Sequence, residues 1–263
     1  MPVLTEEEWR LIARARELCG RAATGEITAT AYLTPREQLV LDECFTGDPG
    51  CFLADGGYAA AERKRFFFLP DYVRETEEPY RGELLADIRA EKLAAVKITG
   101  SGYRELSYRD YLGAVLNLGI KRASLGDLCV SEAFEAVLFA DTTLSAFLAE
   151  NLTRVANDMV RVHAFAPPPD FNGGRRFLSC SDTVPSPRAD AVVAAMCHLA
   201  REKAQALFRE GKVEIFYEPV EKPDRTVCAG DVIVVRGFGK FRINALSDQT
   251  KKGRFRLLFE RYL

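Results

Sequence analysis

The segment Ala200–Val213, with the sequence AREKAQALFREGKV, decides how the C-terminal third of the chain folds. Three polar side chains, Arg201, Gln205 and Arg209, recur at every fourth position and fall within about 80° of one another around a helix. Alanine and leucine side chains occupy a different face, and Gly211 stands where a helix commonly ends in a left-handed residue. The pattern predicts an amphipathic helix over residues 201–210 with an outward polar stripe. Such a stripe is either an ordinary solvated face or a surface that binds an acidic ligand.

The segments on both sides of this helix complete a compact module. Apolar residues between Val192 and Ala200 have helical spacing and follow a Pro-Ser-Pro segment, which suits a helix N-terminus. Strands are expected over residues 213–217 and 231–236, the second opened by a Gly-Asp pair. Two short helices packed on a small sheet would present the polar stripe to solvent.

Charge is distributed unevenly along the 263 residues, which carry 36 Lys and Arg against 38 Asp and Glu, a net charge of −2. From Arg176 onward there are 16 basic and 11 acidic residues, which gives +5; the remaining 20 and 27 give −7 before that point. The strongest basic run, Arg236–Arg256, holds seven Lys and Arg against Asp248 alone. A basic tail on an acidic body predicts a local polyanion site, although solvation explains any single charge equally well.

A proline-rich linker, APPPDFNGG at residues 166–174, separates the basic region from the rest of the chain. Proline blocks helices and central strands, and Asn-Gly-Gly favours turns. We therefore expect an α+β protein of three parts: an N-terminal α/β region over 1–75, a middle domain over 76–168 and a C-terminal domain over 176–263. In the first part, helices are expected over 6–19, 35–45 and, briefly, 59–64, with short apolar segments at 51–54 and 66–69.

The middle domain has the element order β-α-β-β-α-β of a ferredoxin-like sandwich. Strands are expected over 93–99, 127–131, 136–140 and 160–165, and helices begin after a Ser107–Asp110 capping box and after Asp141. RNA-recognition motifs use this RRM-like fold, and their bases stack on aromatic side chains of the two central strands. Phe139 is the one aromatic residue on these two predicted strands. The sequence thus supports the fold and does not support stacking of RNA on its sheet.

Several function classes lack the residues that they need. The seven cysteines include no C-x-x-C pair, and there are two histidines, so we expect reduced thiols, no metal and no cofactor. The sequence has no apolar run of 18 residues, and its acidic start lacks the apolar stretch of a secretory signal. We expect a cytoplasmic monomer without a membrane segment.

Spaced residues between Arg188 and Val235 resemble the S-four RNA-binding domain, also called the alpha-L motif. The matching segments are Arg188-Ala189-Asp190, Ala200–Ala204, Gly211-Lys212-Val213 and Gly230–Ile233. In two places the sequence departs from the usual pattern: Ala200 replaces a serine, and Ile215-Phe216-Tyr217 replaces Val-Asn-Gly.

The resemblance extends over nearly the whole chain to the YlmH family of bacterial proteins. It rests on the segments GGYAAAERKRFFFLPDY (56–72), LSYRDYLGAVLNLGIKRASLGD (106–127), VRGFGKF (235–241) and TKKGR (250–254). This resemblance implies a non-catalytic factor of ribosome-associated quality control. Its partners would be structured RNA, both rRNA and tRNA, on the large ribosomal subunit that still carries peptidyl-tRNA.

In such a factor, arginine and lysine side chains would bind phosphates, and the guanidinium fork would make the contacts directional. The candidate RNA-binding residues are those of the helix face and of the basic tail: Arg188, Arg201, Lys203, Gln205, Arg209, Lys212, Arg236, Lys240, Arg242, Lys251, Lys252 and Arg254.

Two alternatives remain open. An RNA-modifying enzyme of the pseudouridine-synthase type needs a positioned aspartate in a cleft. Asp55 and Asp110 are available, but a turn and a helix cap explain them better, and no nucleophile–base pair is evident. A protein-interaction scaffold linked to cell division would use the acidic N-terminal body. We therefore expect no catalytic residues.

Overall fold

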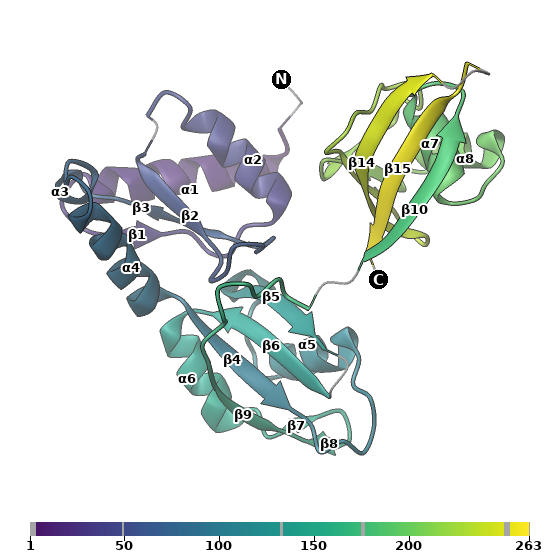
Figure 1. The fold of residues 1–263 in the computed structure, drawn as a ribbon. Helices are drawn as coiled ribbons and strands as arrows, with labels where there is room; N and C mark the ends of the chain where they lie inside the picture. Colours follow the sequence, from purple (N-terminus) through teal and green to yellow (C-terminus); the bar gives the residue numbers. More distant parts are fainter. Residues whose placement is uncertain (1–3, 49, 132–133, 175–176, 250–252, 263) are drawn as a thin grey trace. The chain divides into compact units, whose positions relative to one another are not determined.

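The computed structural model describes residues 4–48, 50–131, 134–174, 177–249 and 253–262. The chain divides into two compact units, residues 1–174 and residues 175–263. Helices alternate with four antiparallel sheets (Figure 1), which makes this a mixed α+β protein as expected from the sequence.

The first part of unit 1 is a three-stranded sheet between two groups of helices. Its strands are β1 (Thr28–Ala29), β2 (Phe52–Asp55) and β3 (Arg65–Phe68), in the order β1-β3-β2. The helices are α1 (Glu6–Ala22), α2 (Pro35–Cys44), α3 (Asp71–Arg74) and α4 (Tyr80–Lys92). Both α1 and α2 begin in a capping box formed by a threonine and the glutamate three residues later.

The central strand β3 is buried on both faces, because successive side chains of a strand point in opposite directions. Phe66 and Phe68 pack with α1 and α2, whereas Phe67 packs with Val73 of α3 and Ile88 of α4. The sequence did not predict α4. We assigned its residues to the middle domain, but α4 packs on the N-terminal sheet.

The expected short helix over residues 59–64 is absent from the structure. This segment is a loop, and the backbone N–H groups of Glu62 and Arg63 donate to the two carboxylate oxygens of Asp127, at 2.7 and 3.0 Å. Gly56 closes the loop tightly, since a Cβ atom there would lie 2.4 Å from the carbonyl oxygen of Arg63. The backbone N–H groups of this segment thus donate to Asp127, far along the chain, and not to carbonyl groups of a helix.

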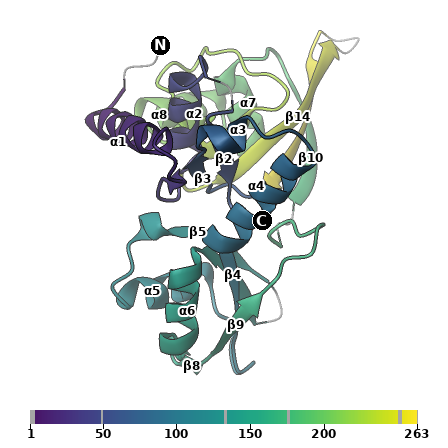
Figure 2. The ribbon, with the colours of Figure 1, turned by 90° about the vertical axis from the view of Figure 1, so that its left-hand side faces the viewer.

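The second part of unit 1 has the expected β-α-β-β-α-β order. It comprises β4 (Ala94–Thr99), α5 (Tyr108–Asn117), a 3-10 turn (Arg122–Ser124), β5 (Leu125–Val130), β6 (Glu135–Ala140), α6 (Thr142–Asn151) and β9 (Arg161–Phe165). A small hairpin of β7 (Arg154–Val155) and β8 (Asp158–Met159) precedes β9. The sheet order is β5-β6-β4-β9, and α5 and α6 pack against the same face (Figure 2).

Local signals placed both helices of this part correctly. Ser107 and Asp110 form the capping box of α5, and the Asp141 side chain accepts from the backbone N–H of Leu144 at the start of α6. Capping depends on residues within one turn, so the sequence alone was sufficient to predict it.

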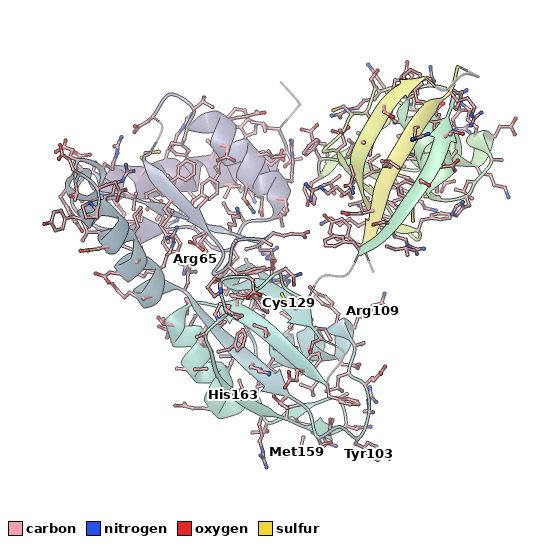
Figure 3. The ribbon with its side chains drawn as sticks, viewed as in Figure 1. Arg65, Tyr103, Arg109, Cys129, Met159 and His163 are labelled. Carbon is pink, nitrogen blue, oxygen red and sulfur yellow. The ribbon has the colours of Figure 1, made fainter. Side chains whose placement is uncertain are left out.

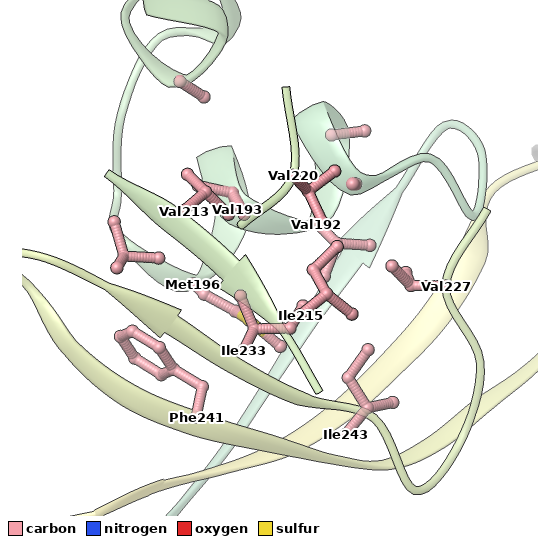
Figure 4. Packing of buried hydrophobic residues seen from close by; sticks show 14 of the residues in the cluster. Val192, Val193, Met196, Val213, Ile215, Val220, Val227, Ile233, Phe241 and Ile243 are labelled. Carbon is pink, nitrogen blue, oxygen red and sulfur yellow. The ribbon is translucent and has the colours of Figure 1, made fainter. Parts of the chain in front are cut away.

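Unit 2 is a six-stranded sheet with α7 (Ala189–Met196) and α8 (Arg201–Arg209) packed against it. In the order of the sheet its strands are β10 (Phe177–Val184), β15 (Phe255–Tyr262), β14 (Gly239–Gln249), β13 (Val232–Val235), β11 (Val213–Ile215) and β12 (Glu218–Pro219). Valine, isoleucine, methionine and phenylalanine side chains fill its core (Figure 4). The sheet is larger than expected, because β10, β14 and β15 were not recognised as strands, and six of the eleven residues of β14 are polar.

Candidate nucleic-acid interface

The carboxylate of Asp190 is the centre of a polar cluster at the start of α7. The residue is fully buried, with 0% of its surface exposed. Arg188 donates to it through Nε and Nη2 at 3.1 and 3.2 Å, and Arg201 of α8 does the same at 3.1 and 3.3 Å. Gln205, one turn further along α8, donates through Nε2 at 2.8 Å. One carboxylate therefore joins the two helices.

Burial raises the pKa of the Asp190 carboxyl. The hydrogen bonds from Arg188, Gln205 and Arg201 together lower it by more than burial raises it, so the pKa is about 2. The carboxylate is therefore ionised at neutral pH and shared by two guanidinium groups. Their side chains remain 39% and 48% exposed. The cluster thus holds two arginines in fixed positions and keeps one positive charge in excess.

The outward stripe expected on α8 differs from the structure at two of its three positions. Arg201 and Gln205 reach across to α7, whereas the Arg209 side chain is exposed and makes no hydrogen bond or ion pair with any other described residue. Helical spacing predicts which side chains share a face, but not what the neighbouring helix brings to that face. Asp190 was visible in the sequence, but its burial was not.

The remaining candidates differ in their surroundings. Lys203 and Arg242 are exposed and, like Arg209, have no such partner in the described part of the chain. Arg254 donates from Nε to the hydroxyl of Thr183 at 3.0 Å. Lys251 and Lys252 lie outside the described residues.

Two further candidate cations have acidic partners on the protein surface. Lys212 pairs with Glu210 at 2.7 Å, and Arg236 pairs with Glu214 at 3.1 Å. The cationic side chains are 47% and 66% exposed. Surface ion pairs of this kind contribute about 0–1 kcal/mol, so a phosphate group can replace the carboxylate at little cost.

Lys240 lies between two tyrosine rings, which the sequence did not associate with it. Its Nζ is 4.5 Å from the ring centroid of Tyr262 and 5.2 Å from that of Tyr217. The pairing of β14 with β15 brings Tyr262, near the end of the chain, next to Lys240. The contact between Lys240 and Tyr262 therefore becomes evident only from the register of the sheet.

The residues Phe216 and Tyr217 form a tight two-residue turn between β11 and β12. Both have left-handed backbone conformations, with φ of 52° and 62°, and the flanking Ile215 and Glu218 are paired in the ladder. This is the geometry of a type I′ turn, in which Asn-Gly is strongly preferred. The turn explains the common Asn-Gly of the S-four pattern at this place, and it explains why β11 ends at Ile215 and not at residue 217.

The two central strands of the β-α-β-β-α-β sheet, β4 and β6, offer no exposed aromatic ring to a nucleic acid. Phe139 is 1% exposed, stacked on Tyr58 at 4.7 Å between ring centroids and packed near Phe171. Asp127 holds the covering loop in place, because it also accepts from the Tyr58 hydroxyl at 2.7 Å. The interpretation that RNA does not stack on this sheet agrees with that burial.

A cavity of about 690 Å³ lies in unit 1 and is lined mainly by small and aromatic residues. Its one carboxylate, Asp55, accepts from the backbone N–H of Gly57 and pairs with Arg89. Asp110, the other aspartate considered for catalysis, is used in the α5 capping box. Both aspartates thus have the structural roles that the sequence favoured.

The described residues contain no cluster of three or more His, Cys, Asp or Glu side chains suited to a metal ion. None of the described helices has both the length and the apolar content to cross a membrane. Figure 3 shows the side chains of both units on the ribbon.

Comparison with known proteins gives three similarities. Residues 92–166 match the domain family described as "Putative RNA-binding domain in YlmH". The chain is similar to "Ribosome-associated protein quality control protein P2" of Bacillus subtilis (strain 168), with 34% identity over 235 residues that cover 88% of this chain and 86% of the relative. It is also similar to the solved "Cell division protein ylmH from Streptococcus pneumoniae", with a TM-score of 0.49 and 15% identity over 63% of this chain and 94% of that chain.

Proposed function

Because this chain belongs to the YlmH family and is a homologue of a ribosome-associated quality control protein with an RNA-binding domain, we propose that it is a non-catalytic factor that binds structured rRNA and tRNA. Its place of action would be the large ribosomal subunit that carries peptidyl-tRNA. The observation that carries this proposal is the 34% identity to the quality control protein over 88% of the chain.

The C-terminal unit supports RNA binding through the arrangement of its cations. The Asp190 cluster fixes Arg188 and Arg201 with their guanidinium groups partly exposed, and Arg209 lies further along the same helix. Preorganised guanidinium groups lose less entropy when they bind phosphate than free side chains do. These residues, together with Lys203, Lys212 and the β14 cations, are the phosphate contacts that we propose.

The roles of Asp55 and Asp110 support a binding factor over an enzyme of the pseudouridine-synthase type. A catalytic aspartate must be free to approach the substrate, but a main-chain turn and a helix cap engage these two carboxylates. Conversion of uridine in ribosomal RNA by the purified protein would contradict this part of the proposal.

A salt titration with ribosomal RNA tests the binding itself. If the protein contacts about four to six phosphates, the plot of log affinity against log salt concentration should have a slope of about −3 to −5. A slope near zero would contradict the electrostatic mechanism.

Co-sedimentation tests the proposed place of action. The protein should pellet with large subunits that carry peptidyl-tRNA and much less with empty large subunits, at matched salt. Equal recovery with both would show that peptidyl-tRNA is not part of the binding site.

A further inference from the structure

The β-α-β-β-α-β part, which matches an RNA-binding domain, must bind RNA away from the usual stacking surface of this fold. RNA-recognition motifs stack bases on aromatic side chains of the central strands. Here β4 has no aromatic residue, and Tyr58 and Phe171 pack against Phe139 of β6, which is buried. An RNA ligand of this domain therefore needs a different surface.

A second hollow, of about 500 Å³, lies on the helical side of this domain. It is formed by α5, by the end of α6 and by the β7–β8 hairpin, and its polar lining includes Arg109, Asn117, Asn151 and Arg154. We propose that this hollow and its rim are an RNA-binding site, which accepts the backbone of a single-stranded segment. The inference rests on the proposed function, and it adds a second contact surface to that of unit 2.

The charge of the hollow suits a phosphate backbone. Arg109 and Arg154 are exposed, and the side chain of neither forms a hydrogen bond or an ion pair with another residue in the described ranges. The carboxylate that also lines the hollow, Asp110, accepts from the backbone N–H and the hydroxyl of Ser107, both at 2.8 Å, and pairs with Arg104. The acidic group is thus engaged, while the two guanidinium groups are available as directional phosphate donors.

Two large side chains are exposed at the end of the domain that carries the β7–β8 hairpin. Tyr103 is 89% exposed and Met159 is 63% exposed, and both lie at the same end of the domain (Figure 3). Met159 is the direct partner of Arg154 in the β7–β8 hairpin, so their side chains share one face. The backbone N–H of Ser101 donates to Asp158 at 3.0 Å, which ties the Tyr103 loop to that hairpin.

This combination favours single-stranded RNA as the occupant over an acidic protein. An unpaired base can stack on the tyrosine ring while phosphates further along the same strand bind the arginines, a combination that sequence-tolerant single-strand sites use. The Asn117 amide can exchange hydrogen bonds with sugar hydroxyls, and Oδ1 of Asn151 can accept one, while its Nδ2 donates to the Phe147 carbonyl at 2.8 Å. An acidic protein surface would use the arginines but brings no base that could stack on the tyrosine ring.

The test uses the full-length chain and measures the binding of a labelled single-stranded RNA oligonucleotide by fluorescence anisotropy. Arg109→Ala/Arg154→Ala should weaken binding about tenfold or more, and make the salt slope shallower by about two. Tyr103→Ala should weaken binding at least about fivefold with an unchanged slope, since stacking does not release counterions.

A charge-matched control is available on α1. Arg10→Ala/Arg14→Ala removes the same two charges from exposed positions, where each arginine pairs with a glutamate of its own helix. This variant should bind the oligonucleotide like the wild type. Circular dichroism spectra of all variants should coincide, because none of the changed side chains is buried.

The outcomes separate the inference from the proposed function. If the wild type binds ribosomal RNA but the hollow variants bind the oligonucleotide as the control does, the inference is wrong and the proposed function stands. The inference is also wrong if the hollow variants bind the oligonucleotide normally but no longer co-sediment with the large subunit, because the hollow would then contact a protein. If the wild type binds neither RNA, the proposed function fails, and the inference fails with it.

Discussion

At the scale of single residues, Asp190 has the largest consequence for the fold. It carries the one negative charge that two arginines and a glutamine share, in a position closed to solvent. Replacing one member of such a cluster affects stability and RNA binding together. Experiments on this cluster must therefore measure both.

We expect Asp190→Asn to destabilise the protein by about 2 kcal/mol at pH 7. The folded-state pKa of about 2 lies below the unfolded value of about 3.9, so ionisation stabilises the fold above about pH 4. That contribution is lost as the pH falls from about 4 towards 2. Urea unfolding at pH 7 and pH 3 should show that the difference between wild type and variant shrinks at the lower pH. A difference that stays constant would show that the carboxylate acts through packing and not through its charge.

The Phe216–Tyr217 turn gives a prediction of the opposite sign. A non-glycine residue in the left-handed region costs about 1–2 kcal/mol, and here two aromatic residues adopt it in succession. Phe216→Asn/Tyr217→Gly should raise the free energy of unfolding by about 1 kcal/mol, even though the contact of Tyr217 with Lys240 is lost.

Urea unfolding of three chains tests this prediction. Phe216→Asn alone should give a smaller gain, and Phe216→Ala none, because alanine tolerates the conformation poorly. If the double variant is less stable than wild type, the aromatic contacts outweigh the backbone strain.

At the scale of elements, α8 combines two kinds of arginine on one helix. Arg201 contributes to the junction with α7, whereas Arg209 has no partner among the described residues. The sequence pattern treats the two as equivalent, since they lie about 80° apart on one stripe.

The two substitutions on α8 should therefore behave differently. Arg209→Ala should leave the free energy of unfolding within about 0.5 kcal/mol of wild type, weaken the binding of ribosomal RNA and reduce the salt slope by about one. Arg201→Ala should weaken binding too, and should also destabilise the fold by about 1.5 kcal/mol, because a buried carboxylate loses a charged donor. Equal stabilities of the two variants would contradict the role assigned to the Asp190 cluster.

At the scale of the whole molecule, residues 177–263 should fold without the rest of the chain. Their core consists of side chains from this unit alone, and β10 pairs along its length with β15, from Phe177 opposite Tyr262 to Val184 opposite Phe255. The isolated fragment should show helical circular dichroism, unfold cooperatively and keep salt-dependent binding of ribosomal RNA. Loss of its structure would place the boundary of the autonomous unit before residue 177.

What the sequence by itself determined lies within short range along the chain. The capping box at Ser107, the left-handed Gly211 and the strands β4 and β6 depend on neighbours within a few residues or on simple hydrophobic periodicity. The charge asymmetry and the spaced S-four residues are also properties of the sequence, and they were enough to indicate the family. None of these signals needs a partner from a distant segment.

The tertiary structure decided which of these residues are free to act. Asp190 and Gln205 are 15 residues apart, and Tyr58 and Asp127 are 69 apart, so no local pattern could indicate that they bond. Polar strands such as β14 likewise gain their structure from pairing with β13 and β15. A side chain's propensity and charge are fixed by its own chemistry, but its burial and its partners depend on segments that only the folded chain brings together.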